Sequence, residues 1–262
     1  MLSKVRVFVL FLFVAISFQP VVSFAPSTKS QPLSAFLVAT HPNRQPAISD
    51  VPKKTKLDSS SPKSNDVVRP DPSILLSSRP DLQQRVGVGI IGSSLLVGAF
   101  TVSSFWTFLK ELTGGFLTTS LSALPLGLIF ILLGASHFFY KDEYAATVPP
   151  TGTWGGLWNV PAPGARDLGL SDAVFHVLWT GVAAIGGGTL LILGGFGTLP
   201  IQIPAALLFL LTLAVSPANI YMFTHDVPLA MTPPLEYPRD HIARAILQIV
   251  LLSLFFNMAT NA

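Results

Sequence analysis

Long apolar stretches with almost no charge limit how this chain can fold more than any other feature. Residues 86–109 and 116–140 contain no charged side chain, and a helix needs about 20 apolar residues to cross a bilayer. In lipid the backbone must satisfy its hydrogen bonds internally, which an open sheet cannot do. The sequence therefore predicts a bundle of membrane-spanning helices with the lipid bilayer as its surroundings.

We expect an all-α membrane protein whose transmembrane bundle occupies residues 86–258. The composition agrees, because 50% of the residues are hydrophobic, only 11% are charged and the mean hydropathy is +0.59. An odd number of spans places the two ends of the bundle on opposite sides of the membrane. The predicted helices cover residues 86–109, 116–140, 172–196, 201–223 and 241–256.

The basic side chains are concentrated near the start of the chain. The first 56 residues hold seven of the 16 basic residues but only one of the 13 acidic ones. The remainder is mildly acidic, so the formal net charge of +3 does not indicate a nucleic-acid partner. The chain has no cysteine, which excludes disulfides, thiolate metal sites and iron–sulfur ligation by its own residues.

Residues 1–23 have the features of a secretory signal peptide. Lys4 and Arg6 precede the apolar run "VFVLFLFVAISF", and Val21 and Ser23 fit the small-residue rule for signal peptidase. The alternative is a first transmembrane anchor, but the run is shorter than the roughly 20 residues that a span needs.

Residues 24–49 are typical of an organelle transit peptide, since they are rich in Ser, Thr, Pro and Gln and contain no acid. Phe24, Ala25 and Pro26 resemble the motif at the cleavage point of bipartite leaders that direct proteins into the complex plastids of red-lineage algae. This resemblance implies a plastid (chloroplast) membrane, thylakoid or envelope. Residues 50–85 combine Ser-Pro steps with alternating charge, and we expect a disordered tether there.

The third predicted helix is rich in small residues. Ala183 with Gly187, and Ala184 with Gly188, have the spacing that lets two transmembrane helices approach closely. A glycine-rich nucleotide loop is not supported, because no strand is expected before these residues and no phosphate-binding lysine follows them. We therefore expect close helix packing here.

Most charged side chains fall in loops that the five-helix order places on one side of the membrane. The loops after the second and fourth helices carry nearly all of this charge. Lysine and arginine are also denser on this side, which favours the stromal face under the positive-inside rule. Four of the five histidines lie within a turn or two of the same side, namely His137, His176, His225 and His241.

Two sets of polar side chains enter the bundle from this side. His241, Arg244 and Gln248 are spaced i, i+3 and i+7, so they share one face of the fifth helix. Ionisable residues at membrane depth usually mark function, although Arg244 is near enough to the helix end to extend to the surface. The fourth helix carries three further polar residues on one face, namely Thr212, Ser216 and Asn219.

Simpler structural roles are open for several of these residues. His137 is followed by three aromatic residues and fits an interfacial aromatic belt, and we expect Trp154 and Trp158 at the level of the lipid headgroups. His225 and His241 flank a proline-rich loop and are expected to be solvated. These structural roles are alternatives to the hypothesis that the same residues form a polar binding site.

Four segments in the second half of the chain resemble, in order, the signature segments of DoxX-like membrane proteins. They are "GASHFFYKDEYAATVPP", "TGVAAIGGGTLLI", "VSPANIYMFTHD" and "ARAILQIVLL", within about residues 126–256. The resemblance implies a four-helix transmembrane bundle, preceded here by one extra helix. Two positions depart from the family pattern, because Lys141 stands where proline is common and Ala184 where many members have glutamate.

The resemblance to DoxX-like proteins also implies a functional setting. Some members are subunits associated with quinone-linked sulfur oxidation or with oxidative-stress complexes, which implies a partner subunit of a membrane complex and makes a quinone the candidate cofactor. No metal-binding motif is evident in the sequence. The ligand-binding positions that the resemblance carries over are His137, Tyr144, Asn219, Arg244 and Gln248, with Pro149 beside them.

Two hypotheses about function follow. In the first, the protein is a redox-associated subunit that binds the headgroup of a quinone or another small lipophile through hydrogen-bond donors at the polar face. In the second, it is a non-catalytic accessory or assembly factor of a thylakoid or envelope complex. A channel is disfavoured because the lower halves of three helices are apolar, and a bis-histidine haem because no histidine pair lies deep in the bundle. Neither hypothesis assigns a catalytic residue.

Overall fold

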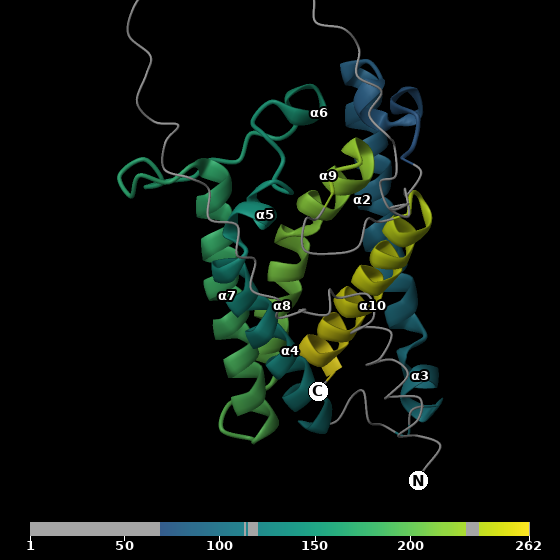
Figure 1. The fold of residues 1–262 in the computed structure, drawn as a ribbon. Helices are drawn as coiled ribbons and strands as arrows, with labels where there is room; N and C mark the ends of the chain where they lie inside the picture. The colour runs from purple at the N-terminus through teal and green to yellow at the C-terminus, as the bar shows by residue number, and fades with distance from the viewer. Residues whose placement is uncertain (1–68, 113, 115–119, 229–235, 262) are drawn as a thin grey trace, which may run out of the picture. The chain divides into compact units, whose positions relative to one another are not determined.

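Five long helical segments run back and forth between two ends of the protein (Figure 1). The computed structural model describes residues 69–112, 114, 120–228 and 236–261, and these residues form helices and turns without a strand. The predicted signal peptide (1–23) and transit peptide (24–49) lie outside the described residues. The five segments are α2 (Asp81–Ser104), α4 (Ser120–Phe139), α7 (Asp172–Gly195), α8 with α9 (Gln202–Ala214 and Ser216–His225) and α10 (Arg239–Asn261).

Each of the five segments is long and apolar enough to cross a bilayer. Their lengths are 20 to 24 residues, and an 18-residue stretch within each has a mean hydropathy of 1.8 to 1.9. The helices also keep large apolar side chains on their outer surfaces, such as Val97 of α2 and Leu210 of α8, which suits contact with acyl chains. The prediction of an all-α, multi-pass membrane protein is confirmed.

Helices α4 and α7 pack closely because glycines line their contact. A Cβ atom added to Gly188 would lie 2.5 Å from the carbonyl oxygen of Gly127, and one added to Gly134 would lie 2.7 Å from that of Gly181. Gly187 meets Leu208 of α8 in the same way, at 2.6 Å. The prediction of close packing through the small residues of this helix is confirmed.

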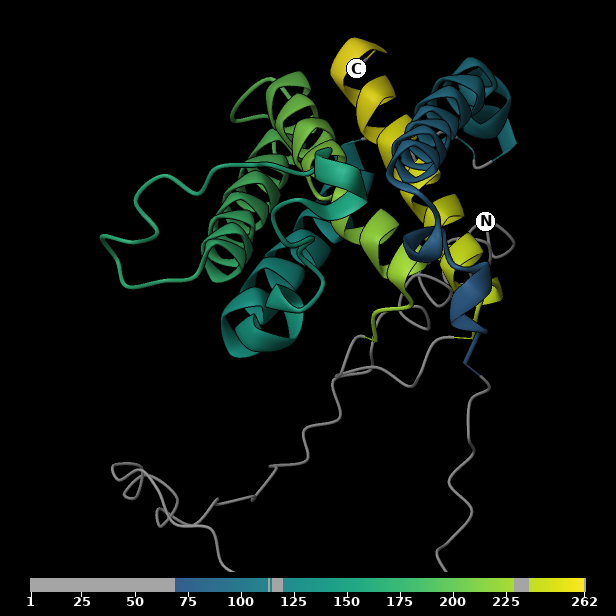
Figure 2. The same cartoon turned by 90° about the horizontal axis from the view of Figure 1, so that it is seen from above.

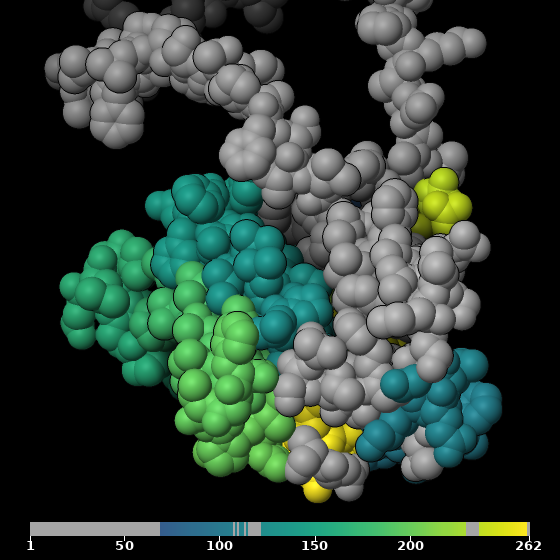
Figure 3. Space-filling model, turned by 90° about the horizontal axis from the view of Figure 1, so that it is seen from below, coloured from purple at the N-terminus to yellow at the C-terminus, as the bar shows by residue number. Residues whose placement is uncertain are grey.

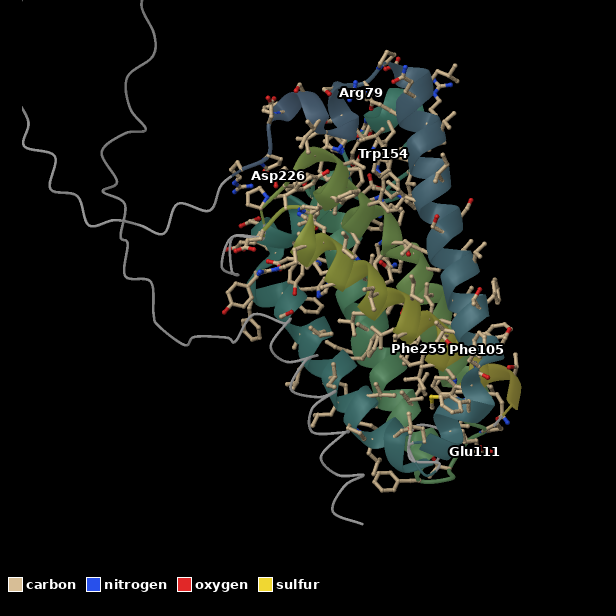
Figure 4. The ribbon with its side chains drawn as sticks, turned by 90° about the vertical axis from the view of Figure 1, so that its right-hand side faces the viewer. Arg79, Phe105, Glu111, Trp154, Asp226 and Phe255 are labelled. Atoms are coloured by element: carbon tan, nitrogen blue, oxygen red, sulfur yellow. The ribbon has the colours of Figure 1, made fainter. Side chains whose placement is uncertain are left out.

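Helices α2 and α10 form a second pair and lie side by side when the protein is seen from above (Figure 2). Gly98 of α2 accommodates Ile249 of α10, and Asn257 Nδ2 donates to Ser103 Oγ across the pair at 2.5 Å. On its other side α10 contacts α8. Phe255 is fully buried at this junction, in one core cluster with Leu208 (Figure 4).

The first transmembrane helix is shifted from its predicted range of 86–109. It begins at Asp81, directly after Pro80, and ends at Ser104. A short helix, α3 (Trp106–Leu112), follows after Phe105. Pro80 fits a helix start because it has no N–H to leave unsatisfied. Trp106 is 7% exposed, so its burial against the bundle core explains why the chain turns here instead of continuing straight.

The fourth helix, predicted as one segment over 201–223, is broken in two. α8 ends at Ala214 and α9 begins at Ser216, with Val215 between them. Pro217 explains the break, because proline donates no backbone hydrogen bond and its ring crowds the preceding turn. The fifth helix is longer than its predicted range of 241–256, because it begins at Arg239 and ends at Asn261.

The expected disordered tether over 50–85 is wrong for its last part. Residues 69–80 form two short 3-10 helices, η1 (Pro72–Ile74) and η2 (Leu76–Ser78). Leu75, between the two helices in sequence, is buried. The prediction of disorder relied on the serine and charge content of the segment and did not take this apolar residue into account. A hydrogen bond from the Ser73 backbone N–H lowers the pKa of the Asp71 carboxyl that caps η1.

The charged segments meet at one end of the bundle, as the predicted helix order requires. Arg69 forms an ion pair with Asp226 at 2.9 Å, and Arg85 donates to the Gly155 carbonyl at 2.9 Å. Figure 4 shows Arg79, Trp154 and Asp226 at this end and Glu111 at the other. The opposite end, seen from below, presents α3, the end of α10 and the α7–α8 turn (Figure 3).

Candidate functional site

A row of polar side chains connects α9 and α10 inside the bundle. Arg244 donates from a guanidinium nitrogen to Asn219 Oδ1 at 3.1 Å. Asn219 Nδ2 in turn donates to Gln248 Oε1 at 3.1 Å. Gln248 is 4% exposed, and nine residues of helix place it about 14 Å along α10 from the helix start. The row therefore extends from the charged end into the membrane-length part of the bundle.

The row ends at the break between α8 and α9. Gln248 Nε2 donates to Ser216 Oγ and approaches the Thr212 carbonyl oxygen at 3.5 Å. Ser216 Oγ also donates to that carbonyl at 3.0 Å. Interrupting the helix at Val215 thus exposes backbone acceptors that side chains can satisfy, as buried backbone groups require. The polar faces of the fourth and fifth predicted helices thus lie against each other.

A cavity of about 100 Å³ lies beside the row, between α2, α9 and α10. Ile91 and Leu95 of α2 form one apolar wall, and Phe223 and Ile220 of α9 contribute further apolar surface. For scale, an apolar cavity of about 150 Å³ in another protein binds benzene. The volume therefore suits a small headgroup. The polar part of its lining comes from Asn219, His241, Arg244 and Gln248.

His241 lines the cavity, and the sequence did not predict its burial. It is 6% exposed, and its Nε2 atom has no hydrogen-bond partner among the described residues. Phe223 and Tyr237 cover the imidazole, with ring centroids 5.7 Å away in both cases. The expectation of a solvated histidine is therefore wrong. The available signal was its spacing from Arg244 and Gln248, which already placed it on the polar face.

His137 and Tyr144 lie outside the cavity lining. Tyr144 belongs to the short helix α5 (Lys141–Ala145), and its ring stacks on His137 with centroids 4.1 Å apart and an interplanar angle of 6°. His137 Nδ1 is bonded to the Leu133 carbonyl at 2.7 Å. The Tyr144 hydroxyl shares a hydrogen bond with Ser136 Oγ at 2.9 Å. His137 Nδ1 and the Tyr144 hydroxyl are thus engaged within their own segment.

An electrostatic interaction connects the stacked pair to the polar row. Burial raises the pKa of the Tyr144 phenol, while the Ser136 hydrogen bond and the positive charge of Arg244 act in the opposite direction. The five predicted ligand-binding residues therefore form two neighbouring groups. Arg244 belongs to the cavity lining and also acts on the stacked pair.

Trp154 is buried, so the expectation that it rests among lipid headgroups is wrong. It is 3% exposed, and its indole N–H donates to Thr224 Oγ1 at 3.1 Å. The residue lies in the short helix α6 (Thr153–Gly156) with a left-handed φ of 57°, a conformation that costs a non-glycine residue about 1 kcal/mol or more. The buried hydrogen bond and the aromatic contacts with Tyr221 and His225 offset this strain.

The chemistry available at the cavity is hydrogen-bond donation. Within the described residues no group of three or more His, Asp or Glu side chains is arranged to hold a metal ion. Comparison with known proteins adds no analogy, because no family model, curated protein or solved structure matches the chain. The sequence and the geometry of the site therefore carry the functional conclusion.

Proposed function

We propose that this chain is a multi-pass plastid membrane protein that binds the headgroup of a small lipophile, such as a quinone, as a redox-associated subunit. One observation carries the proposal. A cavity within the membrane-length helices has an apolar wall from α2, and α9 and α10 add four polar side chains to an otherwise apolar lining. An amphipathic cavity of this kind fits a ligand that needs one polar anchor and an apolar environment.

The donors that face a ligand can be separated from those that hold the wall in place. The amide groups of Asn219 and Gln248 bond to each other. Asn219 also accepts from Arg244, and Gln248 donates to Ser216 at the α8–α9 break. Arg244 makes one hydrogen bond to a described residue, and a guanidinium has five N–H donors. Arg244 and His241 are therefore the groups that would donate to a ligand carbonyl, while Asn219 and Gln248 position Arg244.

Two features of the sequence support the setting of this proposal. The "FAP" junction after residue 23 resembles leaders for complex plastids, which favours a thylakoid or envelope membrane. The segments that resemble DoxX-like proteins contain Asn219, Arg244 and Gln248, the same residues that form the polar row. A chain with no cysteine would need a partner subunit to pass electrons to or from a bound quinone.

A second function, that of an accessory or assembly factor, is favoured by a different observation. The amide groups of Asn219 and Gln248 make hydrogen bonds inside the protein, as expected of a row that only holds α8, α9 and α10 together. Buried polar networks of this kind can specify a unique packing without binding anything. Ligand binding, not fold, distinguishes the two functions.

The deciding experiment is purification of the full-length protein in mild detergent, with co-purifying lipids and subunits identified by mass spectrometry. A quinone analogue is then titrated into the wild type, Arg244→Ala, His241→Ala and the control Thr189→Ala, each checked for folding. We expect weaker binding in the first two variants only, because Thr189 is exposed and bonds within α7. Equal binding by all four proteins would favour the accessory role.

A further inference from the structure

Arg244 has no counter-ion among the described residues, and three acidic side chains at this end of the bundle are paired with other arginines. Asp226 is paired with Arg69 at 2.9 Å, and Asp240 with Arg239 at 3.1 Å. Glu236 is also paired with Arg239, at 2.9 Å. No acidic side chain of a described residue forms an ion pair with Arg244, and the intervening loop 229–235 contains no acid in its sequence. The cavity wall therefore carries an unpaired positive charge.

An unpaired guanidinium at this depth is unfavourable in the absence of an anion. Burying an arginine side chain at membrane depth without a counter-charge is costly. Part of this cost is relieved by the Asn219 carbonyl oxygen, which is neutral. The second unsatisfied group is His241 Nε2, which lines the same cavity. A single acceptor carrying negative charge would satisfy both groups.

The cavity is also open toward the lipid-facing side of the protein. Ile242 lines the cavity and is 52% exposed. Ile246, one turn further along α10, is 57% exposed, and Ile90 of α2 is 62% exposed. Helices α2 and α10 lie side by side in both cartoon views (Figures 1 and 2). An apolar tail attached to a headgroup in the cavity could therefore lie along this apolar surface in contact with lipid.

We propose that the ligand of this cavity is an amphiphile with one carboxylate headgroup and an apolar chain, a fatty-acid-like anion and not a neutral lipophile. The inference rests on the proposed function and names the chemical class of its ligand. The carboxylate accepts hydrogen bonds from Arg244 and from His241 Nε2, and Ile91 and Leu95 contact the first carbons of the chain. A carboxylate adds an opposite charge and can accept two parallel bonds from a guanidinium, which an alcohol or quinone oxygen cannot do, and this favours an acid.

The test compares ligands that differ only in the headgroup. Full-length protein in nanodiscs of a zwitterionic lipid is titrated with laurate and with lauryl alcohol at about pH 8, where a carboxylate is ionised. We expect laurate to bind at least about tenfold more tightly than the alcohol, the scale of one lost charge-assisted hydrogen bond. A quinone analogue and a lysophosphatidate are included as further headgroups. Equal affinity for laurate and lauryl alcohol, or binding of lysophosphatidate alone, would overturn the proposal.

Variants then assign the selectivity to the cavity wall. Arg244→Gln keeps a donor for Asn219 and should abolish the preference for laurate, whereas Arg244→Lys keeps the charge and should retain most of it. The control is Arg79→Gln at the same end of the bundle, which removes an exposed guanidinium outside the cavity lining and should change nothing. A laurate preference that survives Arg244→Gln in a folded protein would overturn the assignment.

Tight binding of the neutral quinone analogue, unaffected by Arg244→Gln, would refute only the carboxylate ligand and would leave the lipophile-binding function in place. Binding of no probe would refute the lipophile-binding function as well.

Discussion

At the scale of single residues, some buried polar groups of this protein are held by partners from distant segments. The indole of Trp154 reaches Thr224 across 70 positions of the chain, and Asn219 reaches Gln248 across 29. In a low-dielectric interior such bonds are strong, and a lost partner leaves a desolvated group behind. Each of these residues therefore fixes the position of a loop or a helix and not only its own side chain.

Trp154→Phe tests the contribution of one such bond. Phenylalanine keeps most of the aromatic contact but has no N–H to donate to Thr224. We expect a loss of about 1–3 kcal/mol in the free energy of unfolding, from the lost hydrogen bond and the smaller ring. Thermal unfolding of the purified protein measures the change. Trp158→Phe is the control, because Trp158 is only half-buried, and a larger loss there than at Trp154 would contradict the assignment.

Residue spacing predicted part of the candidate site and missed the rest for a physical reason. The i, i+3 and i+7 positions on α10 place Arg244 and Gln248 on one face, and the polar residues of α9 predict their partners. The burial of His241 depends instead on Phe223 and Tyr237. The position of these rings is decided by how the two helices cross, which no local pattern encodes.

At the scale of helices, the contact of α4 with α7 depends on backbone approaching backbone. The atoms that a Cβ at Gly188 would meet are the Gly127 carbonyl oxygen at 2.5 Å and the Ile131 amide nitrogen at 3.0 Å. Neither can move without moving its whole helix. The small-xxx-small spacing predicted that such a contact exists. It could not predict the partner helix, because spacing on one helix carries no information about its neighbour.

Gly188→Ala and Gly186→Ala form a matched pair that measures this contact. Both substitutions should raise helix propensity by up to about 1 kcal/mol. An alanine at 186 meets nothing within 4 Å, so we expect a neutral or slightly stabilised protein. An alanine at 188 must push α4 and α7 apart, and we expect a lower melting temperature in detergent. Equal melting temperatures for the two variants would show that the helices are not in close contact.

At the scale of the whole molecule, the order of the helices places most of the charged connections at one end, with Lys110 and Glu111 at the other. Apolar length and charge predicted the five spans and this common end, and contacts such as Arg69 with Asp226 confirm that the segments meet. The helix break at Val215 and the folded segment 69–80 escaped prediction. The break follows from Pro217, whereas the folded segment depends on the burial of Leu75, which local composition does not encode.

Single cysteines provide a direct test of this topology, because the natural chain has none that would react. Substitutions at Arg79, Asp142 and Glu236 lie at the charged end, whereas Glu111 and Thr260 lie at the other, and all five residues are exposed. In sealed vesicles a membrane-impermeant maleimide should label the first three cysteines from one side and the last two only after the membrane is opened, or the reverse. Charge cannot cross the apolar core between the two sets without large cost. Labelling of Asp142→Cys and Glu236→Cys from opposite sides would mean that one of the predicted spans does not cross, and the cavity between α2, α9 and α10 could then not face lipid as proposed.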